Sequence, residues 1–511
     1  MTPATALSRS PFGDEYPIEI TNDGEALQAF AEQWRAAGAE IVAVQGLGFV
    51  GAGMVAALAD ARRPDGTPAF GVIGVDLGDE RNFWKVARTK AGLPPIVCED
   101  PAIDAAYGRA RTTGNLTATT AAEAYGLADV VVIDVNLDIH KTSPDPRDYA
   151  FTFDGYRQAI QAVAQHARED ALVIVETTVP PGTTEQVIRP IFTEAFAARG
   201  LNPSRLALVH SYERVMPGAK YLESITSFYR VFASSDAPSG VRARRFFDTF
   251  INTRDFPLRE LGSTTASELS KVLENSFRAT NIAFMQEWTQ FAEAAGVDLF
   301  SVIEAIRVRP THRNIMVPGF GVGGYCLPKD PLLADWALQS FFGGERRLDM
   351  SLDAVRTNDA MPLHTARLAE SLAGGLAGRR VALLGVSYLD GVADTRWSPS
   401  GAFVEYCEAA GATVALHDPL LAWWPELERS VETTFDGLAV HACDVVVIGV
   451  RHPEYLALTA EAILRWCPKL TVLVDANNVI GDDTAAALVA RGVNVAGVGK
   501  GHWRTHSWRA R

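Results

Sequence analysis

Short apolar segments alternate with helical segments toward both ends of this 511-residue chain, and this alternation limits the possible folds more than any other feature. The apolar segment 41–44 leads into a glycine turn at 46–51 and an alanine-rich helical segment at 54–61. Similar apolar segments follow at 72–75, 130–135 and 172–175. Strands and helices that alternate in this way predict a parallel sheet covered by helices on both faces.

The chain changes character after about residue 260. The sequence Thr265-Ala266-Ser267-Glu268 has the T-x-x-E pattern of a capping box, and it predicts the start of a long helical stretch that ends near Gly296. Apolar segments with strand spacing then return at 380–384, 413–416, 445–449, 471–474 and 493–498. We therefore predict an α/β fold with two Rossmann-like, doubly wound domains joined by a central helical region.

Charge and cysteine content argue against several classes of protein. The formal net charge of −14 disfavours nucleic acid as a partner, because phosphates need a basic surface. The chain has no apolar run long enough to span a membrane, and its N-terminus lacks the apolar core of a signal peptide, so no membrane association is expected. The five cysteines include no CxxC pair, which predicts a cytoplasmic protein without a disulfide framework or a bound metal.

The glycine turn matches the dinucleotide pattern G-x-G-x-x-G, for which a purely structural turn is the alternative. It follows a predicted strand, opens a predicted helix, and has an acidic residue at the end of the next strand. Glycines let backbone approach a pyrophosphate, the helix N-terminus stabilises its charge, and the carboxylate holds the ribose hydroxyls, which favours NAD over NADP. The predicted cofactor contacts are Gly46, Gly48, Phe49, Val50, Gly51 and Asp76.

A second glycine-rich segment, 319–330, carries a single cysteine. Four glycines precede Cys326, and Lys329 and Asp330 follow it. A thiolate is a strong nucleophile, and a nearby ammonium group lowers the pKa of a thiol. The alternative is a structural turn that buries a small apolar residue. A dinucleotide turn and a nucleophilic cysteine in one chain suggest an oxidation that passes through a thioester.

Six motifs in order along the chain resemble those of the nucleotide-sugar 6-dehydrogenases, a family that includes UDP-glucose, GDP-mannose and UDP-N-acetylhexosamine dehydrogenases. The resemblance extends from about residue 40 to residue 500. The motifs lie at 46–51, 176–183, 210–218, 268–275, 319–330 and 385–399.

The resemblance implies a two-step, four-electron oxidation of a sugar C6 alcohol to a carboxylate, with NAD as cofactor and a nucleotide sugar as substrate. Cys326 resembles the nucleophile that carries the thiohemiacetal and the thioester. Lys271 and Asn275, which are spaced i,i+4 on one helix face, resemble the pair that stabilises the oxyanion. Asp330 resembles the carboxylate that assists proton transfer through water, with a helix cap as a second possible role. Glu213 resembles the acid that positions water or the sugar.

The resemblance also implies further contacts to the two ligands. Thr178 and Arg396 match residues near the cofactor, although Arg396 has an ordinary surface arginine as its alternative. The residues expected at the nucleotide sugar are Arg214, Phe320, Gly321, Gly323 and Tyr388.

The resemblance further divides the chain into functional regions. Residues 1–38 are expected to form an N-terminal extension, with a short helix near 23–37, and residues 39–258 the NAD-binding Rossmann domain. Residues 259–370 are expected to form the central helical and dimerisation region with the cysteine loop, and residues 371–511 the C-terminal, UDP-binding domain. In the family the long central helix forms a homodimer interface. The aromatic residues that fit such a face, or alternatively pack within their own chain, are Phe277, Phe284, Trp288 and Phe291.

The identity of the sugar is less constrained than the reaction. Several motifs are most similar to the UDP-N-acetylhexosamine branch, whereas 326–330 is closer to the UDP-glucose version. Three positions depart from the family: Leu137 replaces a threonine, Leu389 a lysine and Asn477 an arginine. The alternatives are therefore GDP-mannose or another unusual sugar nucleotide as substrate, or a non-catalytic nucleotide-sugar binding protein.

Overall fold

The computed structural model describes residues 6–19, 23–216 and 218–505. The chain forms two compact units, each assembled from separate stretches of sequence. The first unit comprises the chain up to His140, together with Ala150–Val272 and Leu333–Arg347. The second comprises Lys141–Tyr149, Leu273–Leu332 and the chain from Leu348 onward.

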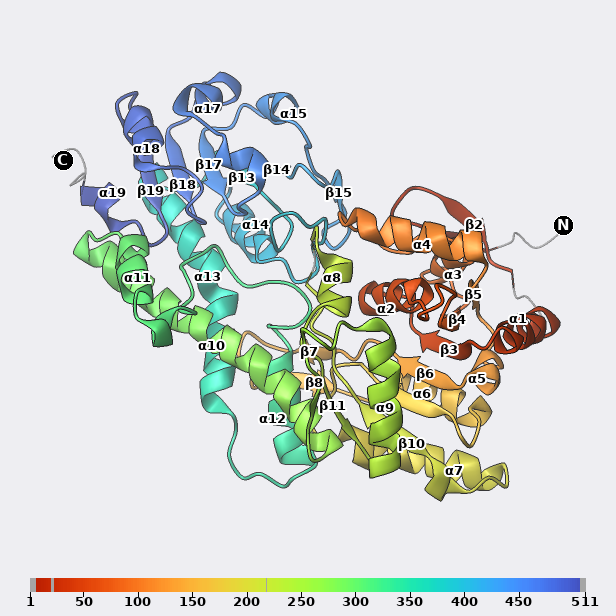
Figure 1. Cartoon of the computed structure of the whole chain (residues 1–511). Coiled ribbons are helices and arrows are strands. Elements are labelled where there is room, and N and C mark those ends of the chain that lie inside the picture. Colours follow the sequence, from red (N-terminus) through yellow and green to blue (C-terminus); the bar gives the residue numbers. More distant parts are fainter. Residues whose placement is uncertain (1–5, 20–22, 217, 506–511) are drawn as a thin grey trace. The chain divides into compact units, whose positions relative to one another are not determined.

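The first unit is built on an eight-stranded sheet with the order β12-β11-β10-β9-β6-β3-β4-β5 (Figure 1). Only β10 and β11 pair antiparallel; the other neighbours are parallel. From β5 to β10 the order is that of the dinucleotide-binding Rossmann fold. The strands are β3 (Glu40–Gln45), β4 (Phe70–Val75), β5 (Leu116–Thr119), β6 (Val130–Ile133), β9 (Leu172–Val175), β10 (Ala207–His210), β11 (Val231–Ser234) and β12 (Arg259–Glu260).

Helices cover both faces of this sheet because its inner strands are apolar on both sides. One face packs against α2 (Phe49–Asp60), α4 (Pro101–Thr113), α8 (Tyr221–Thr226) and α9 (Ala237–Phe250). The other packs against α1 (Gly24–Ala36), α5 (Ala124–Leu127), α6 (Asp154–His166) and α7 (Arg189–Ala198). Helix α1 lies in the predicted N-terminal extension, yet it buries Leu27, Ala31 and Trp34 in this core.

The second unit contains a five-stranded, fully parallel sheet with the order β14-β13-β17-β18-β19. This is the other common doubly wound order, 2-1-3-4-5. The strands are β13 (Arg380–Leu384), β14 (Thr413–His417), β17 (Val445–Ile448), β18 (Val472–Asp475) and β19 (Asn494–Gly497). Helices α13 (Asp349–Ala373) and α14 (Ser400–Ala409) cover one face, and α15 (Phe435–Ala439), α17 (Ala460–Trp466) and α18 (Asp482–Val489) the other.

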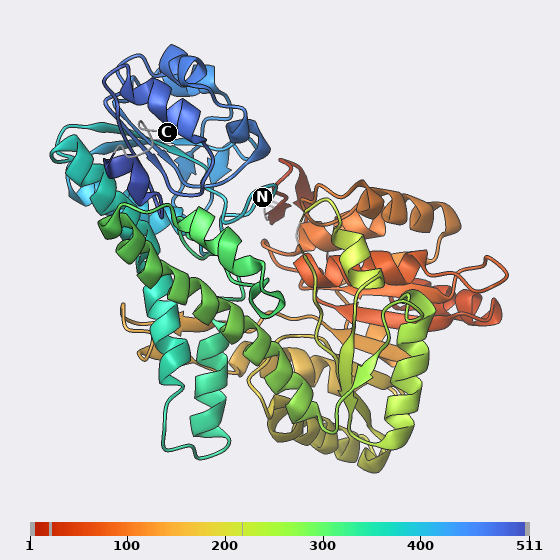
Figure 2. The same ribbon diagram turned by 60° about the vertical axis from the view of Figure 1, so that its left-hand side comes forward.

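Helix α10 (Thr264–Ala295) is the longest element, and the boundary between the units falls within it. Figure 2 shows α10 as one uninterrupted helix that crosses α13, where Asn358 donates to the Ala279 carbonyl. The helix start differs from the predicted capping box. Ser263 Oγ accepts from Ala266 N at 3.1 Å, whereas the Glu268 carboxylate accepts from Gly182 N and Thr184 N at 2.6 and 2.8 Å. Glu268 therefore anchors the turn after β9.

Further α-helices and strands complete the two units. They are β1 (Leu7–Arg9), β2 (Glu15–Pro17), α3 (Phe83–Lys90), β7 (Ile139–Lys141), β8 (Tyr149–Phe151), α11 (Leu299–Arg307), α12 (Asp330–Ser340), β15 (Trp423–Trp424), β16 (Arg429–Ser430), α16 (Pro453–Leu456) and α19 (Gly501–Thr505). Within the described residues, no helix is long and apolar enough to cross a membrane.

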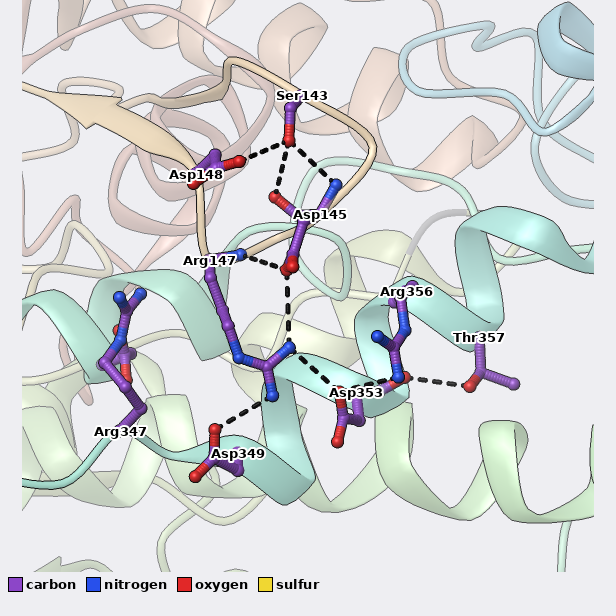
Figure 3. A network of polar contacts seen from close by, with 10 residues as sticks. Ser143, Asp145, Arg147, Asp148, Arg347, Asp349, Asp353, Arg356 and Thr357 are labelled. Atoms are coloured by element: carbon purple, nitrogen blue, oxygen red, sulfur yellow. Dashed lines mark hydrogen bonds and ion pairs between the residues drawn. The ribbon is translucent and has the colours of Figure 1, made fainter.

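The loop between β7 and β8 belongs to the second unit, although the sequence around it forms the first. Arg147 holds this loop on α13: its guanidinium lies 2.9 Å from Asp349 and 3.0 Å from Asp353 (Figure 3). Within the loop, Ser143 Oγ donates to Asp148 at 2.7 Å. The predicted NAD-binding domain, residues 39–258, includes this loop, although the loop belongs to the second unit. The predicted domain limits remain predictions.

The predicted fold class is confirmed, since two doubly wound parallel sheets are present and long helices lie between them in the sequence. Each of the nine predicted apolar segments overlaps a strand of one of the two sheets.

Candidate active site

The glycine turn after β3 has the geometry that a dinucleotide requires. Gly46 has φ +91°, and a Cβ at Gly51 would lie only 1.9 Å from the Gly46 carbonyl oxygen, so neither position accepts a larger residue. A Cβ at Gly48 would meet no atom within 4 Å. The first and third glycines are therefore fixed by close packing, while the space at the second is open for a pyrophosphate. Phe49 and Val50 form the first turn of α2, whose N-terminus faces this space.

Asp76 follows β4 directly and is linked to the turn. Its carboxylate accepts from Leu47 N at 2.8 Å and from Leu77 N at 2.7 Å, and Lys85 Nζ lies 3.9 Å away. Burial raises the pKa of Asp76, and the Lys85 ammonium opposes this rise. The open space at Gly48 and an acid at the end of the second strand fit NAD.

A buried lysine and a buried glutamate are in direct contact in the first unit. Lys271 Nζ donates to the Glu213 carbonyl at 2.9 Å and lies 3.2 Å from the Glu213 carboxylate, and both residues are buried. The guanidinium of Arg214 lies 3.2 Å from the Tyr212 hydroxyl and over the Tyr212 ring. The structure thus brings together Lys271 and Glu213, two residues that the sequence placed at the site.

The second unit contains a matching polar cluster beside the cysteine. Asn275 Nδ2 donates to Asp330 Oδ2 at 2.6 Å, and Lys329 Nζ donates to Asp330 Oδ1 at 3.0 Å. Lys329 and Asp330 direct their backbone N–H groups at the Cys326 carbonyl, which fixes the turn that carries the half-buried thiol. The Lys329 ammonium forms an ion pair with the buried Asp330 carboxylate and lies over the Tyr325 ring.

Lys271 and Asn275 occupy successive turns of α10, so one helix face presents an ammonium and an amide group. Each is already held by a buried carboxylate, Glu213 for Lys271 and Asp330 for Asn275. Stabilisation of developing negative charge by these two donors stays a prediction.

The glycines before Cys326 permit tight packing against the loop after β13. A Cβ at Gly321 would lie 2.4 Å from Pro399, and one at Gly323 would lie 2.7 Å from both Tyr388 and the Trp397 carbonyl. Burial raises the pKa of the Tyr388 phenol to about 12. The structure thus places Gly321 and Gly323 against the loop that carries Tyr388, and their contact with the nucleotide sugar stays a prediction.

Phe320 is the exception among the expected substrate contacts. Its side chain is buried in the core of the C-terminal sheet, where its ring centroid lies 5.6 Å from that of Phe403. The Phe320 backbone N–H is also bonded, to Asn477 Oδ1, and a contact between Phe320 and the nucleotide sugar stays a prediction.

The three departures from the family pattern have different surroundings. Leu137 is buried in the core on the α6 face of the first sheet, and Leu389 is exposed. Asn477, which follows β18, accepts from Phe320 N at 3.0 Å and donates to the Gly449 carbonyl. Asn477 therefore holds the start of the cysteine loop at the carboxyl ends of the C-terminal strands, where doubly wound sheets bind ligands.

The structure places the last two expected cofactor contacts in different units. Thr178 is half-buried in the turn after β9, in the first unit. Arg396 lies in the second unit, where it forms an ion pair with Asp394 and faces the Tyr325 ring. Their contact with NAD stays a prediction.

Two polar features at the carboxyl ends of the strands are not predicted by the sequence. Arg230 and Glu176 form a fully buried ion pair at the carboxyl edge of the first sheet, and Arg230 also donates to Ser211 Oγ at 3.0 Å. The acidic Glu176 was visible in its motif, but no local signal identifies an arginine 54 residues away as its partner. The role of Asn477 was equally hidden, because its partners come from two distant loops.

An NAD-type Rossmann sheet, a second doubly wound sheet and a cysteine between them in sequence define a dinucleotide-dependent oxidoreductase. Comparison with known proteins gives the family. The chain matches the UDP-glucose/GDP-mannose dehydrogenase family in its NAD binding domain over residues 40–251, its central domain over 265–358 and its UDP binding domain over 382–482. The chain belongs to this family. It is an NAD-dependent oxidoreductase of nucleotide sugars, and the predicted family and cofactor are confirmed.

Individual relatives support the same assignment. The UDP-N-acetyl-D-mannosamine dehydrogenase of Pyrococcus horikoshii is 29% identical over 458 residues, which cover 88% of this chain and 98% of the relative. A solved NDP-N-acetyl-D-galactosaminuronic acid dehydrogenase from Methanosarcina mazei superimposes with a TM-score of 0.75 at 26% identity, over 94% of this chain and 98% of that one. The solved P. horikoshii UDP-D-ManNAc dehydrogenase gives a TM-score of 0.75 at 27% identity, over 90% and 100% of the two chains.

Proposed function

We propose that this protein oxidises the C6 alcohol of a UDP-N-acetylhexosamine to the uronic acid, with Cys326 as the covalent nucleophile. The main support is the pair of buried polar clusters at one helix face, Lys271 with Glu213 and Asn275 with Asp330, the second of which adjoins the Cys326 turn. A binding protein without catalysis has no use for so many fixed and desolvated polar groups.

In the proposed reaction, the Cys326 thiolate adds to the C6 aldehyde formed by the first oxidation and gives a thiohemiacetal. Lys271 and Asn275 stabilise the oxygen that carries the developing negative charge. The second oxidation converts the thiohemiacetal to a thioester. Asp330 takes a proton from the water that attacks the thioester, and hydrolysis releases the carboxylate and restores the thiol.

The cofactor would be held by the turn Gly46–Gly51 and by Asp76. When bound, NAD accepts the hydride in each of the two oxidations, so two NAD molecules are consumed per sugar. In this chain the carboxylate of Asp76 receives the adenosine ribose hydroxyls and disfavours a 2′-phosphate.

The proposed sugar rests on the relatives, because several of them are named UDP-N-acetyl-D-mannosamine dehydrogenase and one is an NDP-N-acetyl-D-galactosaminuronic acid dehydrogenase from Ralstonia nicotianae. One observation favours an unusual sugar nucleotide as the second candidate. Leu389 and Asn477 replace two cationic family residues, and Asn477 is committed to backbone partners. A nucleotide sugar here meets less positive charge than is usual in the family.

The experiment is a turnover panel. Purified enzyme with NAD should oxidise UDP-N-acetylmannosamine or UDP-N-acetylgalactosamine and produce about two NADH per sugar, measured by absorbance and by mass spectrometry of the uronic acid. UDP-glucose, UDP-N-acetylglucosamine and GDP-mannose complete the panel. Preference for UDP-glucose or GDP-mannose would replace the proposed sugar, whereas preference for UDP-N-acetylglucosamine would identify the N-acetylhexosamine. The absence of NADH with every sugar, despite tight UDP-sugar binding, would favour the non-catalytic alternative.

We also propose a homodimer formed through α10. Phe277, Phe284, Trp288 and Phe291 are 54%, 49%, 47% and 65% exposed, so their own chain leaves about half of each residue uncovered. Phe284 and Trp288, and Trp288 and Phe291, are in ring contact and form a continuous apolar face, as expected at a subunit interface.

This face gives a direct test. Trp288→Glu should convert a dimer to a monomer, because it introduces charge at the centre of the face, and light scattering coupled to size-exclusion chromatography measures the mass. Val440→Glu is the matched control, since Val440 is an isolated exposed apolar residue on the C-terminal domain. A wild-type monomer, or a dimer that survives Trp288→Glu, would refute this interface. A cytoplasmic location stays a prediction.

A further inference from the structure

The hairpin formed by β1 and β2 lies outside the part of the chain that matches the family, which begins at residue 40. Its strands pair antiparallel from Leu7 and Pro17 to Arg9 and Glu15. In the first unit, β2 lies beside α3 (Figure 1), the helix that follows the predicted ribose-binding Asp76. The family pattern assigns no role to this hairpin.

Ser8 of the hairpin caps α3 from outside the helix. Its hydroxyl accepts from Trp84 N at 3.0 Å, where Trp84 is the second residue of α3, and it donates to the Glu80 carbonyl at 2.8 Å. The local N-cap residue of α3, Asn82, makes no side-chain capping bond. Ser8, which is fully buried, therefore supplies the acceptor that an N-cap side chain usually supplies.

The hairpin holds the other end of α3 as well. Asp14 forms an ion pair with Arg88 at 3.1 Å, and the Arg88 guanidinium lies 3.9 Å from the centre of the Phe12 ring. Phe12 also packs edge-on against Trp84, with 6.3 Å between the rings. The hairpin thus contacts α3 near both ends of the helix.

Helix α3 carries Lys85, whose positive charge lies close to Asp76, the predicted ribose-binding residue. Lys85 donates to Asn82 Oδ1 at 2.7 Å, and its ammonium group lies 3.9 Å from the Asp76 carboxylate. Asp76 in turn accepts from Leu47 N in the glycine turn. A continuous set of contacts therefore runs from Ser8 through α3 and Lys85 to the adenosine side of the dinucleotide turn.

We propose that the N-terminal hairpin is a brace for the adenosine half of the NAD site, with Ser8 as its central positioning residue. The hairpin fixes α3, and α3 fixes Lys85 beside Asp76. A ribose-binding acid held in one position loses less conformational freedom when the cofactor binds. This inference rests on the proposed location of the adenosine site at Asp76.

The test compares ligands by calorimetry on the full-length protein. Ser8→Ala should raise the dissociation constants of NAD and of ADP-ribose roughly fivefold, in line with the loss of a helix cap, and leave UDP binding unchanged. In turnover, KM for NAD should rise by a similar factor while kcat and KM for the sugar nucleotide stay constant. Asp14→Ala, which releases Arg88, should act in the same direction.

Arg9→Ala is the matched control, because Arg9 lies on the same hairpin but is mostly exposed and pairs only with its neighbour strand at Glu15. Unchanged NAD affinity in Ser8→Ala would overturn the proposal, as would an equal loss of NAD and UDP binding. Asp76→Ala distinguishes failure of the proposed brace from failure of the proposed adenosine site. If Asp76→Ala binds NAD as tightly as wild type, the adenosine site itself is wrongly placed.

Discussion

Cys326→Ala should lower the rate of uronic acid formation by at least about a thousandfold, the order of loss seen when a covalent nucleophile is removed. The variant keeps the loop that surrounds the thiol, since Lys329 N and Asp330 N bond to the backbone carbonyl of residue 326. Alanine cannot form the thiohemiacetal, so the second oxidation loses its route. Initial rates of carboxylate formation, followed by mass spectrometry, measure the effect.

Two controls make this result specific. Cys98→Ala is the matched control, because Cys98 is also a half-buried free thiol but lies in the first unit, and it should retain wild-type rates. Binding of NAD and UDP to Cys326→Ala should match wild type, which excludes misfolding. Carboxylate formation by Cys326→Ala at the wild-type rate would rule out the covalent mechanism.

The sequence predicted the parts of the fold whose signal is local. Strands β9 and β13 coincide with the predicted segments 172–175 and 380–384, because a buried parallel strand is a continuous apolar run bounded by polar residues. Strands β5 and β11 were not predicted, since LTAT and VFAS mix apolar and polar residues, whereas β9, of the same length, is entirely apolar. Pairing with a neighbouring strand, which sequence alone does not reveal, makes them part of the sheet.

Side-chain partners far apart in sequence were beyond prediction. Glu268 has the spacing of a capping-box acid, but the backbone of Gly182 and Thr184 competes for its carboxylate and wins because three donors converge there. The Ser8 cap on α3 arises in the same way, since its hairpin is 76 residues from Trp84. At the candidate site, residue types and order were predictable, whereas the carboxylates that hold Lys271 and Asn275 became visible only in three dimensions.

Lys271→Met should reduce kcat by about a hundred- to a thousandfold, as the removal of one oxyanion donor does, while KM for the sugar nucleotide changes much less. Lys271 is proposed to act on charge that develops during the reaction, so its loss affects the transition state more than substrate binding. Steady-state kinetics with the preferred sugar from the panel separate the two parameters.

The same substitution leaves Glu213 buried beside an apolar side chain, which should lower the free energy of unfolding by roughly 3 kcal/mol. The double variant Lys271→Met, Glu213→Gln removes the uncompensated charge and should recover most of that stability, measured by urea denaturation. Because Glu213 is itself expected to position water or the sugar, Glu213→Gln alone is the reference for kcat. If Lys271 served only to neutralise Glu213, the double variant would match the kcat of Glu213→Gln. A kcat of the double variant far below that of Glu213→Gln, in a protein with restored stability, would assign the ammonium group of Lys271 to the reaction itself.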